Sequence, residues 1–185
     1  MKEKILSLSL KINMQKILFF LSLVIGMQLT AQNNNQPSCA LPEAAQFNFW
    51  LGDWNLTYGD TMHATNHVEK IMDGCTVQEN FVDPHGNYMG KSWSVYNKNY
   101  KIWQQTWVDN QGGYITLTGN MQGDSMVLTT TERNVPATIS PTGKIIMRMV
   151  YHNIKAGSFD WDWEGSTDSG NTWKNNWHIH YDRKK

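Results

Sequence analysis

The chain lacks net charge and is poor in charged residues of either sign. Its 185 residues include 16 Lys and Arg against 16 Asp and Glu. Charged residues make up 17% of the chain, whereas an average globular domain has about 25%. A neutral chain offers no basic surface for nucleic acid or for an anionic membrane. We therefore expect no nucleic-acid partner.

Common catalytic motifs are also missing. The chain has no G-x-S-x-G elbow, P-loop, H-E-x-x-H or C-x-x-C motif, and no recognisable Ser/His/Asp set. These absences do not exclude an enzyme, because some enzymes carry their chemistry on residues scattered over several strands. Aromatic residues are abundant instead, with nine Trp, seven Tyr and six Phe. They supply a large aromatic core or pocket within one domain.

An apolar run near the start of the chain is typical of a secretory signal peptide. Residues 17–29 carry no charge, with Lys11 and Lys16 before them and Ala31 after them. A transmembrane helix needs about 20 apolar residues, so a short membrane anchor is only the alternative. We expect a signal peptide over residues 1–31, cleaved after Ala31, and a secreted or periplasmic mature chain without a membrane span. Met14 is an alternative start.

Two cysteines, Cys39 and Cys75, remain after this cleavage. Residues 32–39 are expected to form a polar tether, and Cys39 does not directly follow the apolar run, so we expect no lipid anchor. An oxidising compartment permits a Cys39–Cys75 disulfide, and the alternative is two buried free thiols. A bridge that closes a loop of this length contributes about 3–4 kcal/mol in the loop-entropy model.

The rest of the chain, residues 40–185, is expected to be one domain of consecutive strands. Residues 40–47 fit one short helix, with Pro42 near its start. Runs rich in Trp, Tyr, Val, Ile and Thr then alternate with Gly, Asn and Asp, which predicts strands and turns. The predicted strands cover residues 54–58, 64–72, 76–82, 89–96, 100–108, 114–118, 125–131, 144–152, 159–164 and 173–181. Short connections make neighbours antiparallel, and about ten such strands protect their edges best in a closed up-and-down β-barrel. A two-sheet sandwich is the alternative.

Side chains on a strand alternate between two faces, so the sequence indicates which residues point inward. In the last predicted strand Trp177, Ile179 and Tyr181 share the apolar face. His178 and His180 share the opposite, polar face. The same rule groups on apolar faces Phe159, Trp161, Trp163, Ile145, Met147, Met149 and Tyr151.

One predicted strand, over residues 100–108, mixes aromatic and polar side chains on one face. Trp103, Gln105 and Trp107 share that face. The mixture suits a pocket wall, where a few polar groups orient a ligand among apolar ones. The alternative is a half-buried strand with an outer aromatic stripe. The residues expected to line a ligand site are Trp93, Trp103, Gln105, Trp107, Trp161, Trp163 and Trp177.

Two acidic residues on neighbouring early strands, Glu69 and Glu79, are candidates for acid–base chemistry. If either points inward among the Trp residues, loss of solvent raises its pKa and makes it a candidate acid or base. Arg148 could supply a counter-charge. The alternative is an ion pair or a solvated side chain, because most charge in proteins lies outside.

His178 and His180 are the candidate metal ligands, because residues two apart on a strand share a face. Catalytic zinc needs three protein ligands and an open position. His152, His67 or His63 could supply the third ligand if the fold brings one of them close. The alternative is a pair of exposed histidines without a metal, and we expect no cofactor.

The segment over residues 47–54 (FNFWLGDW) resembles the F-x-x-x-G-x-W opening of lipocalin-like (calycin) barrels. Further matches follow in order, namely Glu69 and the sequences GCTVQE at 74–79, GKSWSVY at 90–96, WQQTWVD at 103–109, LTG at 117–119, STDSGNTWK at 166–174 and YDR at 181–183. Together they are similar to a bacterial secreted family known as domain of unknown function 1579. The resemblance covers nearly all of residues 40–185 and implies a lipocalin-like barrel, but no established chemistry.

The haem-binding nitrobindins are more distant relatives in shape, and they hold haem with a His on a late strand. His178 and His180 lie in a comparable part of this chain. The opening here departs from the nitrobindin pattern W-x-G-x-G, because Trp54 is followed by Asn-Leu-Thr-Tyr. Both His also fall on the polar face by alternation, so we do not expect haem.

Three functions remain open from the sequence. The first is an exported barrel that binds a small apolar or aromatic molecule in a Trp-rich interior. The second is an isomerase, cyclase or hydratase that uses an inward Glu or a His-bound metal. The third is a structural or envelope-interaction barrel with a packed interior. A sealed core favours the third function, a cavity with an inward Glu favours the second, and an apolar cavity without convergent ionisable groups favours the first.

Overall fold

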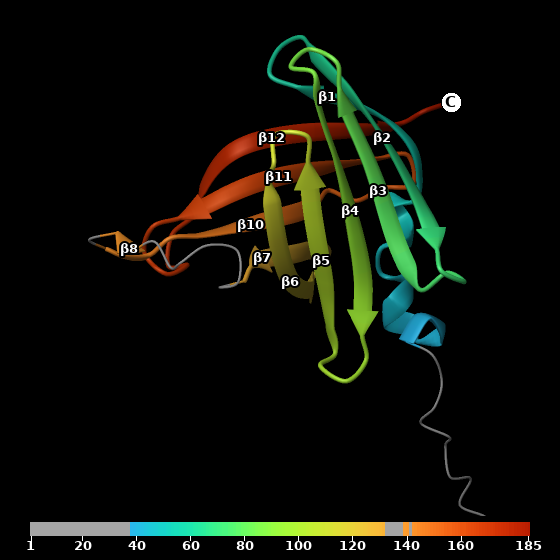
Figure 1. The fold of residues 1–185 in the computed structure, drawn as a ribbon, viewed down its shortest axis with the longest axis horizontal. Helices are drawn as coiled ribbons and strands as arrows, with labels where there is room; N and C mark the ends of the chain where they lie inside the picture. The colour runs from blue at the N-terminus through green and yellow to red at the C-terminus, as the bar shows by residue number, and fades with distance from the viewer. Residues whose placement is uncertain (1–37, 132–138, 141) are drawn as a thin grey trace, which may run out of the picture. The chain divides into compact units, whose positions relative to one another are not determined.

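The computed structural model describes residues 38–131, 139–140 and 142–185. The expected signal peptide and most of the expected tether lie outside these residues. Over the described part, ten antiparallel strands form a closed barrel in the order β1-β12-β11-β10-β7-β6-β5-β4-β3-β2 (Figure 1). They are β1 (Gly52–Tyr58), β2 (Met62–Ile71), β3 (Thr76–Asp83), β4 (Tyr88–Asn97), β5 (Ile102–Asp109), β6 (Tyr114–Gln122), β7 (Ser125–Thr130), β10 (Ile146–His152), β11 (Ser158–Ser166) and β12 (Lys174–Arg183).

The barrel is up-and-down, because neighbouring strands follow one another in the sequence and β12 closes the ring against β1. This arrangement confirms the predicted up-and-down antiparallel barrel and excludes the sandwich. A small hairpin of β8 (Ile139–Ser140) and β9 (Gly143–Lys144) lies between β7 and β10 and is absent from the sequence prediction. Lys144 therefore belongs to this hairpin, and β10 begins only at Ile146.

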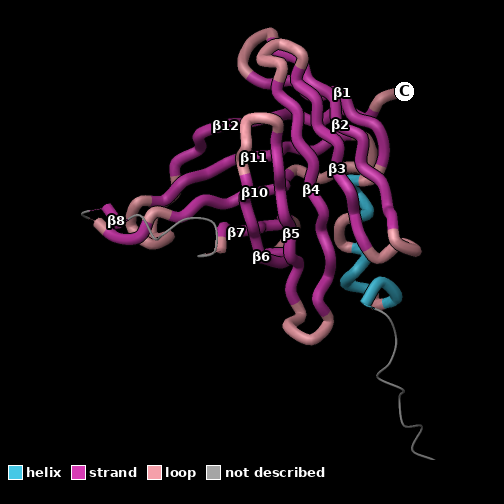
Figure 2. The backbone as a smooth tube through the Cα atoms, viewed as in Figure 1, coloured by secondary structure: helices cyan, strands magenta, loops and turns pink. Residues whose placement is uncertain are grey.

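Three short 3-10 helices precede the strands, where the sequence predicts one short helix (Figure 2). They are η1 (Ser38–Ala40), η2 (Pro42–Ala45) and η3 (Asn48–Trp50). Phe47, between η2 and η3, is fully buried and packs edge-on against Trp103 at 4.7 Å between ring centroids. Trp103 Nε1 donates to Gln46 Oε1 at 3.0 Å. These contacts fill one end of the barrel with aromatic rings and leave the opposite end for the cavity.

Arg183 near the carboxyl end of the chain joins the last strand to the segment that opens the first. Its Nη1 donates to the carbonyl of Leu51 at 2.8 Å, and its guanidinium lies over the ring of Trp54 at 4.2 Å. Gly52 has φ of 120°, and a Cβ there would lie 2.5 Å from Arg183 Nη1. The positive φ favours glycine at this position, and a larger residue would also displace the Arg183 guanidinium.

The structure contains the Cys39–Cys75 disulfide that the sequence predicts. The bridge joins η1 to the residue that precedes β3, over a separation of 36 residues. A disulfide of this kind is typical of proteins that fold in an oxidising compartment.

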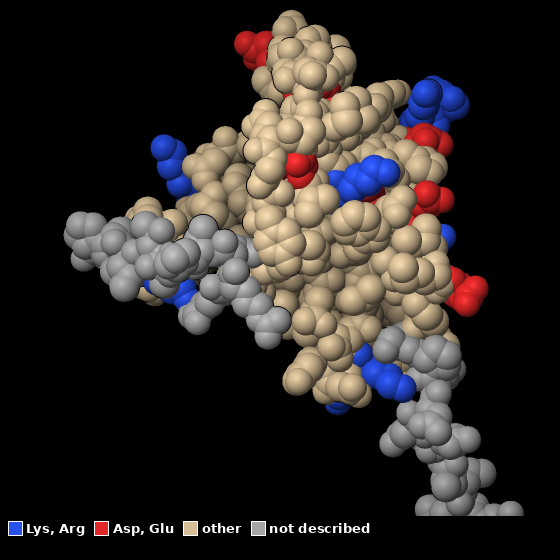
Figure 3. All heavy atoms as spheres, viewed as in Figure 1, with Lys and Arg blue, Asp and Glu red and all other residues tan. Residues whose placement is uncertain are grey.

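The face of the barrel in Figure 3 carries few charged side chains, and those of the two signs are interspersed. Among the described residues, no helix has the length and apolar character needed to cross a membrane. The exposed hydrophobic side chains include Tyr100 and Tyr114, which lie at hairpin ends.

Candidate functional site

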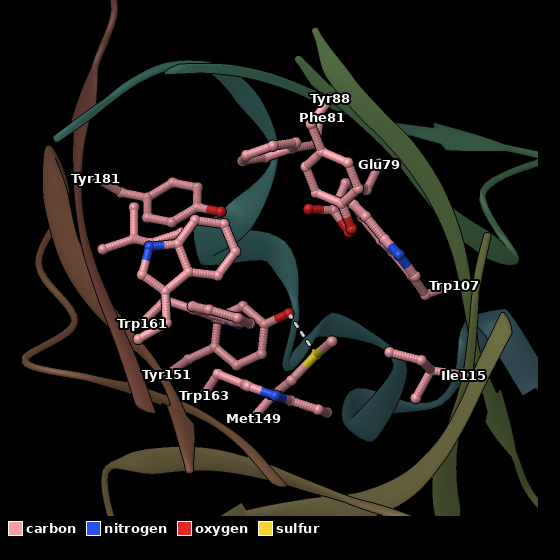
Figure 4. A pocket seen from close by; sticks show the side chains of 12 residues that line it. Glu79, Phe81, Tyr88, Trp107, Ile115, Met149, Tyr151, Trp161, Trp163 and Tyr181 are labelled. Atoms are coloured by element: carbon pink, nitrogen blue, oxygen red, sulfur yellow. Dashed lines mark hydrogen bonds between the residues drawn. The ribbon is translucent and has the colours of Figure 1, made fainter. Parts of the chain in front are cut away.

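The interior of the barrel holds a cavity of about 240 Å³ at the end opposite the 3-10 helices (Figure 4). Most of its wall is aromatic or aliphatic, as expected for the inner positions of alternating strands. The lining residues are Glu79, Phe81, Tyr88, Trp107, Ile115, Met149, Tyr151, Trp161, Trp163, Trp177, Ile179 and Tyr181. Four of them are only half-buried and mark the open side, namely Tyr88, Ile115, Trp163 and Trp177.

The register of β11 and β12 explains how the Trp residues meet. Trp161 lies opposite Ile179, and Trp163 lies opposite Trp177. Trp161 packs parallel to Trp163 at 6.3 Å between ring centroids and edge-on to Trp177 at 5.7 Å. These three rings form one wall of the cavity, and such rings favour edge or offset contact with a further aromatic ring.

Among the described residues that line the cavity, Glu79 is the only acidic one. Its side chain is buried, and both carboxyl oxygens accept a hydrogen bond. Asn66 Nδ2 donates to Oε1 at 2.7 Å, and Ser92 Oγ donates to Oε2 at 2.6 Å. Burial raises the pKa of Glu79 to about 7, although the bonds from Ser92 and Asn66 lower it in part. Glu79 can therefore hold or release a proton near neutral pH.

The hydrogen bonds of Glu79 extend into a buried polar network. Gln105 Nε2 donates to Ser92 Oγ at 2.9 Å, and Asn66 Nδ2 lies 3.4 Å from the hydroxyl of Tyr181. Two buried carbonyl oxygens of this network, Asn66 Oδ1 and Gln105 Oε1, have no hydrogen-bond partner in the structure. Buried acceptors are normally satisfied, but neither Asn66 nor Gln105 is among the residues that line the cavity, so these two oxygens lie in the interior beneath it.

Two tyrosine hydroxyls, those of Tyr151 and Tyr181, also belong to the cavity (Figure 4). Burial and the charge of Glu79 raise the pKa of both well above the ordinary value. Both hydroxyls therefore keep their protons at neutral pH and are available as donors. The one hydrogen bond drawn within the cavity is a weak contact from the Tyr151 hydroxyl to Met149 Sδ at 4.0 Å.

Asp109 orders the rim of the cavity. Its Oδ2 accepts hydrogen bonds from Tyr88 at 3.0 Å and from Trp107 Nε1 at 3.1 Å. Its Oδ1 accepts from the backbone of Gln111 and Gly113. Partial burial by itself raises the pKa of Asp109, but these hydrogen bonds outweigh it and hold the pKa below its ordinary value. The carboxylate thus stays ionised and fixes the two aromatic rings that flank the opening.

The structure places four residues of the expected ligand site on the cavity wall: Trp107, Trp161, Trp163 and Trp177. Two others lie inside the barrel but away from the wall. Gln105 belongs to the network beneath Glu79, and Trp103 packs against Phe47 at the filled end.

Trp93 does not line the cavity, contrary to the sequence prediction. It lies on the outer face of β4, where its Nε1 donates to Gln78 Oε1 at 3.0 Å. The inner positions of β4 are occupied by the buried side chains of Ser92, Ser94 and Tyr96. The prediction followed residue type, whereas strand alternation decides which way a side chain points.

Sequence reasoning missed several residues of the site. Strand alternation assigned Met149, Tyr151, Ile179 and Tyr181 to inner faces, and this signal was sufficient to include them. Ser92 and Asn66 gave no comparable signal, because small polar side chains also occur at exposed positions of strands.

The two acidic candidates, Glu69 and Glu79, lie on opposite sides of the barrel wall, with Glu79 at the cavity. Glu69 lies on the outer face of β2 with 47% of its side chain exposed, and its Oε1 is 3.9 Å from His67 Nε2. Glu69 therefore does not contribute to the cavity. Arg148 is not the counter-charge of Glu79 either, because it pairs with Glu164 and lies over the ring of Trp173.

His178 and His180 lie on the outer face of β12, as alternation predicts. Each is paired with a carboxylate of β11, His178 with Asp162 and His180 with Asp160, both at 2.6 Å. The expected third ligands His63 and His67 lie on β2, which β1 separates from β12. No His is among the residues that line the cavity, so the described interior offers no axial His ligand for haem.

Comparison of the chain with known protein families finds no matching family model, and comparison with curated proteins finds no match.

Proposed function

We propose that this protein binds a small aromatic molecule inside the barrel. The observation that carries the proposal is a cavity of about 240 Å³ with an aromatic wall and a single carboxyl group. An apolar cavity of about 150 Å³ accommodates benzene, whereas drug-sized ligands occupy roughly 300–1,000 Å³. The volume therefore suits a molecule of one or two rings. A packed structural barrel would fill this space with side chains.

The polar groups at the cavity define the chemistry of the ligand. Glu79 is the acidic residue on the cavity wall, and its carboxyl oxygens accept further hydrogen bonds when it is ionised. A ligand that carries one N–H or O–H group would donate to this carboxylate. The ligand that fits best is therefore an aromatic molecule with one polar donor.

Several sequence features support export of this binding protein. The apolar leader over residues 17–29 has the layout of a signal peptide, and the Cys39–Cys75 bridge suits an oxidising compartment. The motif over residues 47–54 supports kinship with the secreted lipocalin-like family named above. In this proposal the mature protein begins after Ala31 and acts in the periplasm or outside the cell.

Calorimetric titration with indole tests the binding proposal. We expect indole to bind, and we expect Ile115→Trp to abolish binding because a larger ring at the half-buried rim fills the opening. Trp93→Phe is the matched control, because Trp93 lies on the outer face. The matched probe 1-methylindole lacks the N–H donor and should bind about tenfold or more weakly. Binding that is unchanged in Ile115→Trp, or no binding of either probe, contradicts the proposal.

A second candidate function is proton transfer on a bound carbonyl compound. The specific observation is the inward Glu79, whose raised pKa of about 7 suits a general acid or base, with the hydroxyl of Tyr181 nearby through Asn66. The test is deuterium exchange of 2-indanone in heavy water, followed by NMR. An enzyme of this type would accelerate the exchange, and Glu79→Gln would reduce the acceleration about a hundredfold or more while 2-indanone still binds. No acceleration by the wild-type protein removes this candidate.

A further inference from the structure

The outer faces of β10, β11 and β12 carry a second concentration of ionisable side chains, on the other side of the wall from the cavity. These three strands are neighbours in the barrel (Figure 1). On β11, Asp160 and Asp162 alternate with inward aromatic side chains and therefore face outward. Asp162 lies opposite His178 on β12. His152, at the end of β10, lies in the same outer row.

Asp162 bridges two imidazoles that come from different strands. His152 Nε2 lies 2.9 Å from Asp162 Oδ2, and His178 Nδ1 lies 2.6 Å from Asp162 Oδ1. One ligand atom from each of the three residues lies within 4.8 Å of the others. Zinc holds nitrogen and oxygen ligands at about 2.0–2.2 Å, so its ligand atoms lie some 3–4 Å apart. Small side-chain rotations therefore suffice to place all three atoms around one ion.

The surroundings of these three residues favour a cation. Asp162 is mostly buried, with 13% of its side chain exposed, whereas His178 is 52% exposed. Asp160 adds a second carboxylate, 3.9 Å from His178 Nε2. The nearby cation on β10, Arg148, is neutralised by its pair with Glu164. The partly buried side chains of His152 and Asp162 hold their ligand atoms in place, and the exposed imidazole of His178 leaves the site open to an ion from solvent.

The donor set also indicates the class of metal. Two imidazoles and one carboxylate suit zinc and neighbouring divalent transition metals, whereas calcium and magnesium prefer oxygen ligands. The fourth position would face solvent and would be filled by water.

We propose that His152, Asp162 and His178 form a binding site for one divalent transition-metal ion of the zinc class. This site differs from the pair that the sequence suggests, because His180 is engaged with Asp160 and Asp182 instead. The ion would link the three adjacent strands β10, β11 and β12 on the outer surface of the barrel. The site is separate from the cavity and does not depend on the function proposed for it.

Titration of Zn²⁺ into chelator-treated, tag-free protein tests this proposal by calorimetry. We expect one Zn²⁺ per chain, and an affinity about tenfold or more lower in His152→Ala, His178→Ala and Asp162→Asn. His67→Ala is the matched control, because His67 is also half-exposed and paired with a carboxylate, Asp53, but lies on β2. Circular dichroism in the presence of a chelator confirms that each variant is folded.

Two results would overturn the proposal. One is the absence of stoichiometric Zn²⁺ binding, which would leave these residues as a hydrogen-bonded cluster only. The other is loss of Zn²⁺ binding in His180→Ala together with retention in His152→Ala, which would move the site to the pair of histidines on β12.

Discussion

At the scale of single residues, Glu79 links the stability of the barrel to its proposed function. A carboxyl group in an apolar interior is costly to ionise, and within the described part of the chain two hydrogen bonds, from Asn66 and Ser92, support the charge. The raised pKa is the consequence of that cost. An apolar side chain here would avoid that cost, so the carboxyl group on the cavity wall supports the proposal that the ligand carries a polar donor.

This burial predicts an unusual pH dependence of stability. The carboxyl group ionises near pH 4.5 in the unfolded chain but only near pH 7 in the folded protein. The contribution of Glu79 to the free energy of unfolding should therefore fall as pH rises through this interval, by roughly 3 kcal/mol, and stay constant above it. Tyr88, Tyr151 and Tyr181 also face Glu79 but remain protonated, because the pKa of each is raised.

Urea unfolding at about pH 5 and about pH 8 measures this effect. We expect Glu79→Gln to lose less stability than the wild-type protein between the two conditions, because a neutral amide does not titrate. Glu69→Gln is the control, since Glu69 is exposed on the outer face of β2. An identical loss in Glu79→Gln and in the wild-type protein would show that Glu79 is not buried as the structure has it.

At the scale of elements, β11 and β12 each serve two sites through their two faces. The inner face of β11 supplies Trp161 and Trp163 to the cavity, and its outer face supplies Asp160 and Asp162 to the histidine cluster. Period-two alternation makes such a division automatic, and the sequence shows it in both strands. The partner across the strand pair is set by register instead, and one slipped residue would exchange the two faces.

Turn residues between the strands predicted the strand bounds well. They carry no information on which face of a strand a side chain occupies, and the prediction failed on that point for Trp93. Gly and Asn at the hairpin ends located all ten barrel strands within a few residues of their observed bounds. Trp93 was assigned to the interior although its neighbour two residues earlier, Lys91, is exposed on the same face. Consistent use of alternation would have turned Trp93 outward.

At the scale of the whole molecule, the chain is held closed at both of its described ends. Arg183 fastens β12 to the segment before β1, and the disulfide fastens η1 to the start of β3. The fastened segment carries Phe47, which fills one end of the barrel. Closure thus determines that only the opposite end is open to a ligand.

The disulfide gives a prediction for the stability of the whole chain. Replacement of both Cys39 and Cys75 by Ser should lower the free energy of unfolding by about 3–4 kcal/mol, because the unfolded chain regains the entropy of a loop of 36 residues. Urea unfolding under non-reducing conditions measures the loss. Wild-type protein in reducing buffer is the matched control and should unfold like the double variant. Equal stability of the wild-type protein and the double variant would contradict the entropic role of the bridge.

The sequence by itself determined the strand order, the antiparallel barrel, the disulfide partners and the inward direction of most Trp residues. These properties depend on local patterns, namely turn residues, alternation and a single pair of cysteines. Only the tertiary structure decided that Glu79 rather than Glu69 reaches the cavity, and that His152 rather than His63 or His67 meets His178. Both outcomes depend on register between strands and on closure of the ring, which bring together residues that no local pattern relates.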